Sequence, residues 1–382
     1  MTDPVQSLPR LADVLAVLDG LYDPRWAQSW DSVGLVTGDL DQPVRRVLLA
    51  VDPVDAVIAE AVDWRADLLL VHHPLLLRGV HSIATNHPKG RAVTALVQAG
   101  LALHVAHTNA DVASPGVSDA LARTLGLHDL RPLQPVAGDA LDKIVVFVPT
   151  ADAERVLDAM ADAGAGRVGA YERAAWSTEG IGTFRPLDGA RPAVGEIGAV
   201  EQVHEVRVEM VVSPRRRTAA IEALRAAHPY EEPAFDVIPT ATPPGPRGVG
   251  RVGELPESET LQAFAARVSR ALPVTPAGVR VAGDLGADVR TVAVCGGAGD
   301  DLFDDVRRAG ADVFVTADLR HHPASESLAH GGLALVDCAH WATEWPWLGV
   351  AEQQLLDGLA AREATVETRV SHLVTDPWSF RV

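Results

Sequence analysis

The same order of segments occurs twice in this chain, far apart in the sequence, and this repeat strongly constrains the fold. The first copy consists of apolar runs and a helical pattern that end in a histidine pair: 47–51, 55–64, 66–71 and His72-His73-Pro74. The second copy has the corresponding segments at 291–295, 300–309, 311–315 and His321-His322-Pro323. Alternating strand and helix patterns are typical of βαβ units. The repeat therefore predicts an α/β protein made of two related halves.

Length, composition and charge narrow the class of protein. A chain of 382 residues is long enough for two or three domains with well-buried cores. Hydrophobic residues make up 47% of the chain and aromatic residues 5%, which suits buried parallel or mixed sheets. The formal net charge of -18 disfavours nucleic-acid binding and favours cations. The one basic run, Arg215-Arg216-Arg217, is interpreted as a solvated helix start.

The cysteine content and the N-terminal sequence indicate a cytoplasmic protein. The chain has two cysteines, Cys295 and Cys338, so we expect no disulfide framework. Residues 1–9 lack the basic and apolar regions of a secretory signal. The apolar stretches have the length of strands, and we expect no membrane contact.

The chain divides into two halves and an insertion between them. We place the halves at 1–135 and 248–382 and the insertion at 140–240. Within the insertion the predicted strands and helices alternate in the order βαββαβ, at 144–148, 151–163, 168–177, 203–212, 218–227 and 234–238. This order predicts a ferredoxin-like α+β domain. A linker rich in proline and glycine follows it, as expected at a domain boundary.

Both copies contain a histidine with an acidic residue four positions later. The pairs are His107 with Asp111 and His340 with Glu344. This spacing places both side chains on one face of a helix, where they can reach one metal ion. A single pair of this kind is more often a surface hydrogen bond, so the pairs gain meaning only from their context.

His72 and His73 supply that context, because they stand directly after a buried strand. Ligands commonly bind at the carboxyl ends of strands in α/β sheets. Neighbouring side chains of a strand point to opposite faces, so both histidines bind metal only if the backbone turns or each serves a different ion. A dinuclear site with a bridging carboxylate satisfies this condition. The alternative is that the two histidines merely cap the strand.

Several further residues have two interpretations each. We interpret Asp318 and His322 as groups that line the site, orient ligands and hold water, whereas His321 is equally well a structural residue. Asp31 lies either in a loop directed toward the site or in an ordinary turn. Residues 296–299 form a glycine-rich turn after a strand, whose amides are able to hold an anion. Cys338 is a potential soft ligand, but small buried thiols are usually inert.

Taken together, these motifs resemble the Nif3-like family of dinuclear metal proteins, whose members are often named GTP cyclohydrolase 1 type 2 homologues. The motifs that carry the resemblance are Trp30-Asp31-Ser32-Val33-Gly34-Leu35, His72-His73-Pro74, His107-Thr108-Asn109 with Asp111, 296–299, Thr316 with Asp318, and His340 with Glu344. The insertion resembles the PII-like (CutA-like) domain of longer bacterial members at Gly164-Ala165-Gly166, Tyr171, Gly182-Thr183-Phe184, 205–209 and 228–233. One departure is Ala317, where the family usually has glycine. We expect it to be tolerated unless the position needs a positive φ angle.

The resemblance implies a fold, an assembly and a set of ligands. It implies two interlocked α/β halves in a homohexamer, a trimer of dimers with the metal pairs facing an inner cavity. The metal ligands that it implies are His72, His73, Asp111, His340 and Glu344. His107 matches a position that lines the site and binds metal weakly at most.

Such a site predicts a hydrolase. Five ligands shared by two divalent ions leave open positions, as in catalytic sites, and a bridged pair of ions lowers the pKa of water. His107 or His322 would then move protons. The donor set fits Zn, Fe, Mn or Ni. The family name suggests a nucleotide, and more broadly a small-molecule substrate with a C–N or phosphoester bond.

The sequence is also compatible with two other functions. Metal storage, delivery or a regulatory scaffold without turnover is the main alternative, and the PII-like insertion slightly favours it. The segment 228–233 is then either a loop near the cavity mouth or, as we prefer, the end of a helix that packs a trimer. Nucleic-acid binding in the cavity is disfavoured by the negative charge.

Overall fold

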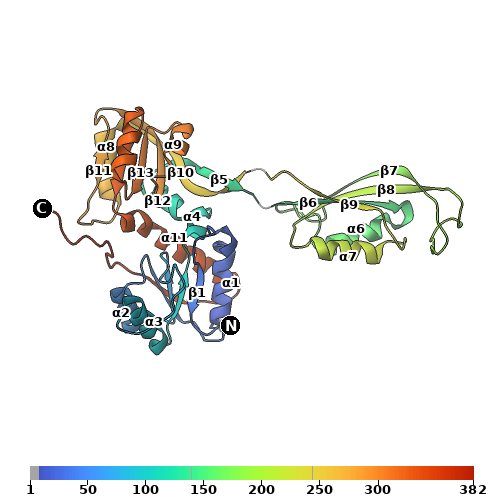
Figure 1. Cartoon of the computed structure of the whole chain (residues 1–382), viewed down its shortest axis with the longest axis horizontal. Coiled ribbons are helices and arrows are strands. Elements are labelled where there is room, and N and C mark those ends of the chain that lie inside the picture. Colours follow the sequence, from blue (N-terminus) through green and yellow to red (C-terminus); the bar gives the residue numbers. More distant parts are fainter. Residues whose placement is uncertain (1–7, 139, 243) are drawn as a thin grey trace, which may run out of the picture. The chain divides into compact units, whose positions relative to one another are not determined.

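The computed structural model describes residues 8–138, 140–242 and 244–382, and the chain in it divides into two compact units (Figure 1). One unit combines the residues up to Val136 with those from Pro246 onward, and the other spans Ala137–Gly245. The domain boundaries 1–135, 140–240 and 248–382 stay a prediction. The N-terminal residues of the first range lie outside the described residues.

The first half of the larger unit is built on a five-stranded sheet with the order β1-β4-β3-β2-β15. Its strands are β1 (Gly34–Thr37), β2 (Arg46–Ala50), β3 (Leu68–Val71), β4 (Ala102–Val105) and β15 (Glu367–Val370). β2, β3, β4 and β15 run parallel, and β1 is antiparallel to β4. The helices of this half are α1 (Leu11–Leu21), α2 (Asp55–Asp63) and α3 (Pro88–Ala99). Every residue of β3 and β4 is buried, as expected for central parallel strands.

The second half is built on a six-stranded sheet with the order β11-β14-β13-β12-β10-β5. Its strands are β5 (His128–Ala137), β10 (Pro244–Thr260), β11 (Arg280–Ala282), β12 (Asp288–Ala298), β13 (Val313–Ala317) and β14 (Ala334–Cys338). The helices are α8 (Leu261–Ala271), α9 (Phe303–Ala309) and α10 (His321–Ala329). The halves interlock, because β5 precedes the insertion but joins the second sheet, and the C-terminal β15 joins the first. The prediction of two related, interlocked α/β halves is confirmed.

The repeat extends to individual contacts. Asp67 accepts hydrogen bonds from two backbone amides at the start of β2, and Asp312 does the same at the start of β12. Gly38 and Gly283 have φ angles of 135° and 137°, and an added Cβ would lie 2.7 Å and 2.9 Å from the Cβ atoms of Ala102 and Ala334. These matching contacts identify the strands after Asp67 and Asp312 as equivalent elements of the two halves.

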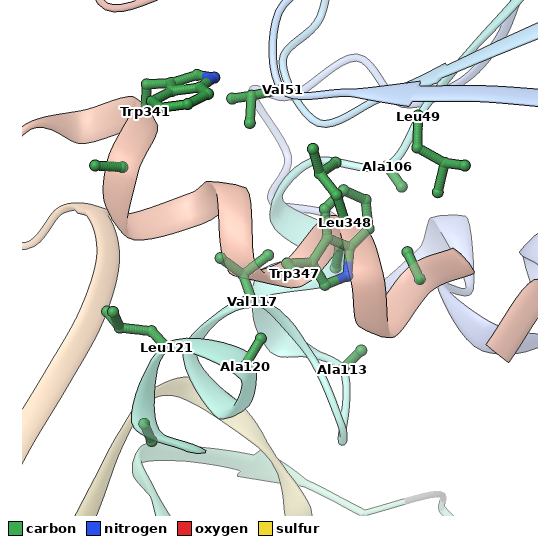
Figure 2. Close-up of a cluster of buried hydrophobic side chains, with 14 of the residues drawn as sticks. Leu49, Val51, Ala106, Ala113, Val117, Ala120, Leu121, Trp341, Trp347 and Leu348 are labelled. Carbon is green, nitrogen blue, oxygen red and sulfur yellow. The ribbon is translucent and has the colours of Figure 1, made fainter. Parts of the chain in front are cut away.

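Helix α11 (His340–Ala360) joins the two halves through the main hydrophobic core. It carries Trp341, Trp347 and Leu348 into a buried cluster that also contains Leu49 and Val117 (Figure 2). Its other neighbours there include residues of α1, of α5 (Val117–Thr124) and of the second sheet. Because the first turn of α11 is mostly buried, its polar residues must find partners inside the protein.

The smaller unit is a four-stranded antiparallel sheet with two helices. Along the chain its elements are β6 (Asp142–Pro149), α6 (Ala153–Asp162), β7 (Ala175–Phe184), β8 (Glu201–Val212), α7 (Arg217–Ala227) and β9 (Phe235–Pro239). The strand order is β7-β8-β6-β9, and all neighbouring pairs are antiparallel. One apolar face, with Ile144 and Val208, packs against Val156 and Leu224 of the helices. The resemblance of this unit to PII-like domains stays a prediction.

The segment after α7 is fixed by polar contacts within this unit. His228 follows the helix, and its Nε2 lies 2.9 Å from the carbonyl oxygen of Phe147. The hydroxyl of Tyr230 donates to Glu205 at 3.0 Å. The segment thus ends a helix, in line with the interpretation we preferred, whereas its packing in a trimer stays a prediction.

None of the described helices combines the length and apolar character needed to cross a membrane. The cytoplasmic location stays a prediction.

A buried ion pair fixes the strand that returns from the insertion. Arg251 of β10 is 1% exposed, and its guanidinium lies 2.6 Å from Asp119 of α5. The same guanidinium donates to the carbonyl oxygens of Gly248, Gly250 and Ala113. Removing one partner of such a pair leaves an uncompensated buried charge.

We expect Asp119→Ala to lower the free energy of unfolding by about 3 kcal/mol, measured by urea titration with circular dichroism. The control is Asp41→Ala, which removes the exposed ion pair with Arg10 and should cost less than about 1 kcal/mol. Equal effects of the two substitutions would contradict this account.

Candidate metal centre

Four histidines from both halves converge on one place inside the larger unit. His72 and His73 directly follow β3, His107 follows β4, and His340 begins α11. The ring centroids of His72 and His73 lie 5.0 Å apart, those of His73 and His340 5.1 Å, and those of His72 and His107 5.1 Å. Strand ends on one side and a helix start on the other therefore form a single cluster, the imidazole cluster.

The backbone turns where the two neighbouring histidines stand. The amides of His72 and His73 both approach the carbonyl oxygen of Val51, at 3.2 Å and 2.9 Å. In a regular strand consecutive amides point in opposite directions. This turn satisfies the condition under which both side chains reach the same site.

Each imidazole is held through its Nδ1 atom. The partners, at 2.7–2.9 Å, are the Ala106 carbonyl for His72, Asp52 for His73, Asp31 for His107 and Asp318 for His340. Such partners fix the orientation and the tautomer of a metal-binding histidine and leave Nε2 as the donor atom. All four histidines of the cluster show this arrangement.

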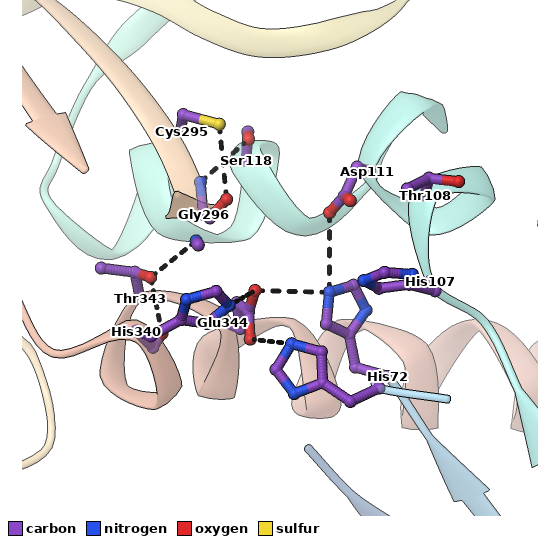
Figure 3. A network of polar contacts seen from close by, with 12 residues as sticks. His72, His107, Thr108, Asp111, Ser118, Cys295, Gly296, His340, Thr343 and Glu344 are labelled. Carbon is purple, nitrogen blue, oxygen red and sulfur yellow. Dashed lines mark hydrogen bonds and ion pairs between the residues drawn. The ribbon is translucent and has the colours of Figure 1, made fainter. Parts of the chain in front are cut away.

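Two carboxylates face the imidazoles. Glu344, which is 2% exposed, lies 2.9 Å from His340 Nε2, 3.2 Å from His73 Nε2 and 3.5 Å from His72 Nε2. Asp111 of α4 (Thr108–Val112) lies 3.7 Å from His72 Nε2. Asp111 and Glu344 thus both reach toward His72 (Figure 3). The spacing of four between His340 and Glu344 brings both onto one face of α11.

Gly297 makes room for the Glu344 carboxylate. Gly297 has a φ angle of 69°, and an added Cβ would lie 2.6 Å from Glu344 Oε1 and 3.0 Å from His340 Nε2. The Gly297 amide donates to Thr343 Oγ1, and the Gly296 amide lies 3.3 Å from Ser118 Oγ. The amides of Gly296 and Gly297 are thus used within the protein, and Gly297 allows the close approach of α11. Anion binding by the turn 296–299 stays a prediction.

The charges in the cluster shift one another's pKa values. Burial acts to lower the pKa of His73 and His340, but the Glu344 carboxylate outweighs it, and with its other partners raises them to about 11 and about 9. Burial acts to raise the pKa of Glu344, but His73, His340 and His72 hold it well below its usual value. Protons and cations therefore compete strongly for the donor atoms of the imidazole cluster.

The donor atoms suit a metal ion. Two groups have ligand atoms that all lie within 4.8 Å of one another: His72, His73 and His107, and His73, His340 and Glu344. His72 Nε2 and Glu344 Oε2 are buried and make no hydrogen bond of good geometry, and their nearest polar contacts are ion pairs, with Glu344 Oε1 at 3.5 Å and His73 Nε2 at 3.2 Å. Buried polar atoms without good hydrogen bonds are rare in proteins, and a cation between them would satisfy both.

Some of the other predicted site residues contact the imidazole cluster, and one lies on the exposed start of α10. His107 lies in the cluster, and Asp31 holds it, so Asp31 belongs to a loop directed at the site. Asp318 orients His340, as predicted for a residue that lines the site. His322 is exposed in the first turn of α10, packs against His321, and shows no contact with the cluster among the described residues.

Three smaller predictions can also be compared with the structure. The positive φ angle of the Thr316–Asp318 segment falls on Asp318, at 55°, so Ala317 fits without strain. Burial raises the pKa of the Cys338 thiol to about 12, which disfavours it as a ligand. Asp52, which holds His73, was missed by sequence reasoning. Its position directly after the strand pattern at 47–51 was the available signal.

Parallel strands whose carboxyl ends carry imidazoles and carboxylates define an α/β protein with a candidate metal centre between two related halves. Residues 9–377 match the model of the family described as Duf34/NIF3 (NGG1p interacting factor 3), and the chain belongs to this family.

Two named relatives and one solved structure also support membership in this family. A Mycobacterium tuberculosis protein named "GTP cyclohydrolase 1 type 2 homolog" is 52% identical over 97% of each chain. A Bacillus subtilis protein of the same name is 40% identical over 94% of this chain and 95% of its own. The crystal structure of a Bacillus cereus protein related to NIF3 has a TM-score of 0.82 and 37% identity, covering 98% of this chain and all of the other.

We expect Gly297→Ala to abolish tight metal binding, because the new Cβ meets Glu344 and His340. The matched control is Gly310→Ala, which imposes the same kind of backbone strain at a φ angle of 72° with nothing within 4 Å. Elemental analysis after dialysis checks the metal content. Both variants should lose about 1 kcal/mol or more of stability from the strained backbone. Loss of metal in both variants, or in neither, would show that the close approach at Gly297 is unimportant.

Metal affinity should rise with pH. Because the pKa of His340 is raised from 6.5 to about 9, protons compete with the cation near neutral pH, and the affinity for Mn²⁺ should increase as pH rises across this interval. Without metal the sign is opposite: the raised pKa stabilises the fold below pH 6.5, and this stabilisation is lost as pH rises through about 9. Calorimetry in buffers of different ionisation enthalpy should detect protons released on Mn²⁺ binding. An affinity independent of pH, with no proton release, would contradict this.

Proposed function

We propose that this chain is a metal-dependent hydrolase that holds two divalent ions between its halves. The observation that carries the proposal is the common orientation of the four imidazoles. Each Nδ1 is held from outside, and each Nε2 is left free to face the buried Glu344 carboxylate or the other imidazoles. A purely structural cluster would not need four separate orienting partners.

The proposed ligands are His72, His73, Asp111, His340 and Glu344. His72 and His73 would each offer one imidazole nitrogen, and Glu344 lies within 3.5 Å of both. Imidazole and carboxylate donors suit Zn, Fe, Mn or Ni. Bound divalent ions supply Lewis acidity, which polarises a substrate oxygen and lowers the pKa of water.

His107 is our candidate for moving a proton. Asp31 accepts from its Nδ1 at 2.8 Å, which leaves Nε2 free to accept a proton beside the ligands. The sequence indicates His322 for the same role, but the exposed start of α10, where it lies, supports this role less.

The proposed substrate is a small molecule with a C–N or phosphoester bond, and a nucleotide is the leading class. Support for a nucleotide comes from the name "GTP cyclohydrolase 1 type 2 homolog" carried by the M. tuberculosis and B. subtilis relatives. We further propose that the protein assembles as a homohexamer, a trimer of dimers, as the family resemblance implies.

Glu344→Ala should remove both metal ions and all metal-dependent hydrolysis, because it takes away the carboxylate shared by three imidazoles. Glu344→Gln keeps the size of the side chain and should also lose metal. Elemental analysis should give about two ions per chain in the wild type and none in either variant. The hydrolysis rates of the wild type and of both variants are then compared on a panel of nucleotides and phosphoesters.

The control is Glu352→Ala, which lies on the same helix outside the cluster, with circular dichroism to check the fold. Metal retained in both Glu344 variants would overturn the site. Full metal loading without hydrolysis above the Glu344→Ala background would favour storage or a regulatory scaffold instead.

A further inference from the structure

We propose that the C-terminal segment 371–375 is part of the metal centre, because the hydroxyl of Thr375 positions His73 for metal binding through the carboxylate of Asp52. Thr375 is a positioning residue in this proposal, since it acts on the imidazole through another side chain. The inference rests on the proposed function only in taking His73 as a metal ligand, and it does not require that the centre hydrolyses any substrate.

The carboxylate of Asp52 connects the segment to the imidazole cluster. Its Oδ1 lies 2.7 Å from His73 Nδ1, and its Oδ2 accepts a hydrogen bond from the Thr375 hydroxyl. These are the hydrogen bonds of the Asp52 side chain among the described residues, one for each oxygen. Without the hydroxyl, the carboxylate is held only at its end toward His73. It can then rotate, and the imidazole that it orients loses its fixed direction.

A second carboxylate of the cluster, Asp31, shows how such a group is held when its partners are local. Its buried side chain accepts hydrogen bonds from the amide of Ser32 and from both the amide and the hydroxyl of Thr108. The Asp52 side chain is 23% exposed, and its second partner, Thr375, lies 323 positions further along the chain. A threonine hydroxyl, a carboxylate and an imidazole are therefore connected twice in this site, and the second connection requires the C-terminal segment.

Buried contacts hold the segment in place. Ser371 is 2% exposed, its amide donates to the carbonyl oxygen of Leu49 at 2.8 Å, and its hydroxyl donates to Glu60 at 2.6 Å. The indole of Trp345 donates to the carbonyl oxygen of Ser371 at 2.9 Å. Trp345 directly follows the proposed ligand Glu344 in α11. The segment is thus fixed both to β2, which leads to Asp52, and to the helix that carries Glu344.

The test compares two substitutions of Thr375 in the full-length protein. Thr375→Val removes the hydroxyl but keeps the approximate volume of the side chain. We expect it to lower the affinity for Mn²⁺ about tenfold, since loss of a group that orients a metal ligand typically lowers affinity by about 10- to 100-fold. Thr375→Ser retains a hydroxyl and should keep the wild-type affinity. Titration calorimetry measures the affinity, and the visible spectrum of the Co²⁺-loaded protein reports a change in ligand geometry.

The matched control is Thr368→Val in β15, the same substitution at another half-buried threonine, whose side chain makes no hydrogen bond among the described residues. It should leave the Mn²⁺ affinity and the Co²⁺ spectrum unchanged. Asp52→Ala should lower the affinity at least as much as Thr375→Val. In the Asp52→Ala background, Thr375→Val should change the affinity less than about twofold, because the hydroxyl acts through that carboxylate.

Unchanged affinity in Thr375→Val would overturn the positioning role. Equal losses in Thr375→Ser or Thr368→Val, or a full additional loss in the Asp52→Ala background, would overturn it as well. A wild type that binds no Mn²⁺ would overturn the metal centre together with this inference. The expected affinity losses in a protein that hydrolyses nothing would support the positioning role and reject only the hydrolase.

Discussion

The buried carboxylate of Glu344 is the constraint on which the rest of the larger unit depends. An ionised carboxylate at 2% exposure is strongly unfavourable unless cationic partners compensate it. Its own half supplies His340, but the other two imidazoles within 3.5 Å, those of His73 and His72, come from the first half. The carboxylate is therefore stable only when both halves are in place, whether protons or metal ions carry the positive charge.

The interlocked strands provide the fixed relation between the halves that this site needs. Metal ligands tolerate errors of only a few tenths of an ångström in position. Exchange of β5 and β15 between the two sheets makes each half incomplete without the other. Helix α11 adds a packed core on both sides, and Arg251 ties the strand after the insertion to Asp119 of the first half. The insertion thus interrupts the chain without loosening the site.

Much of this arrangement could be predicted from local sequence patterns. Alternating apolar and helical segments gave both sheets, and the position of His72 and His73 after a strand indicated the edge at which the cluster lies. The exchange of β5 and β15 could not be predicted, because pairing between distant strands leaves no local pattern. The roles of Asp52 and Asp31 were harder to predict for the same reason, because a carboxylate that orients a histidine is identified only by its hydrogen bond to that histidine. His322, which the sequence indicates as a residue that lines the site, lies in the exposed first turn of α10, and its role stays a prediction.

The two copies share the strand scaffold, but the side chains at their strand ends differ. Counted from the equivalent residues Asp67 and Asp312, the positions of His72 and His73 are occupied by Ala317 and Asp318 in the second copy, and not by the histidines of α10. Val47 and Val292 lie opposite equivalent residues of the next strand, but the register between β12 and β13 then shifts between Val294 and Ala298, so the two strands diverge before Gly297. Where the first copy supplies His72, His73 and a carboxylate that holds His73, the second supplies space for Glu344 and a carboxylate for His340. Equivalent strand ends therefore carry different side chains, and the two copies together form one asymmetric cluster in place of two identical ones.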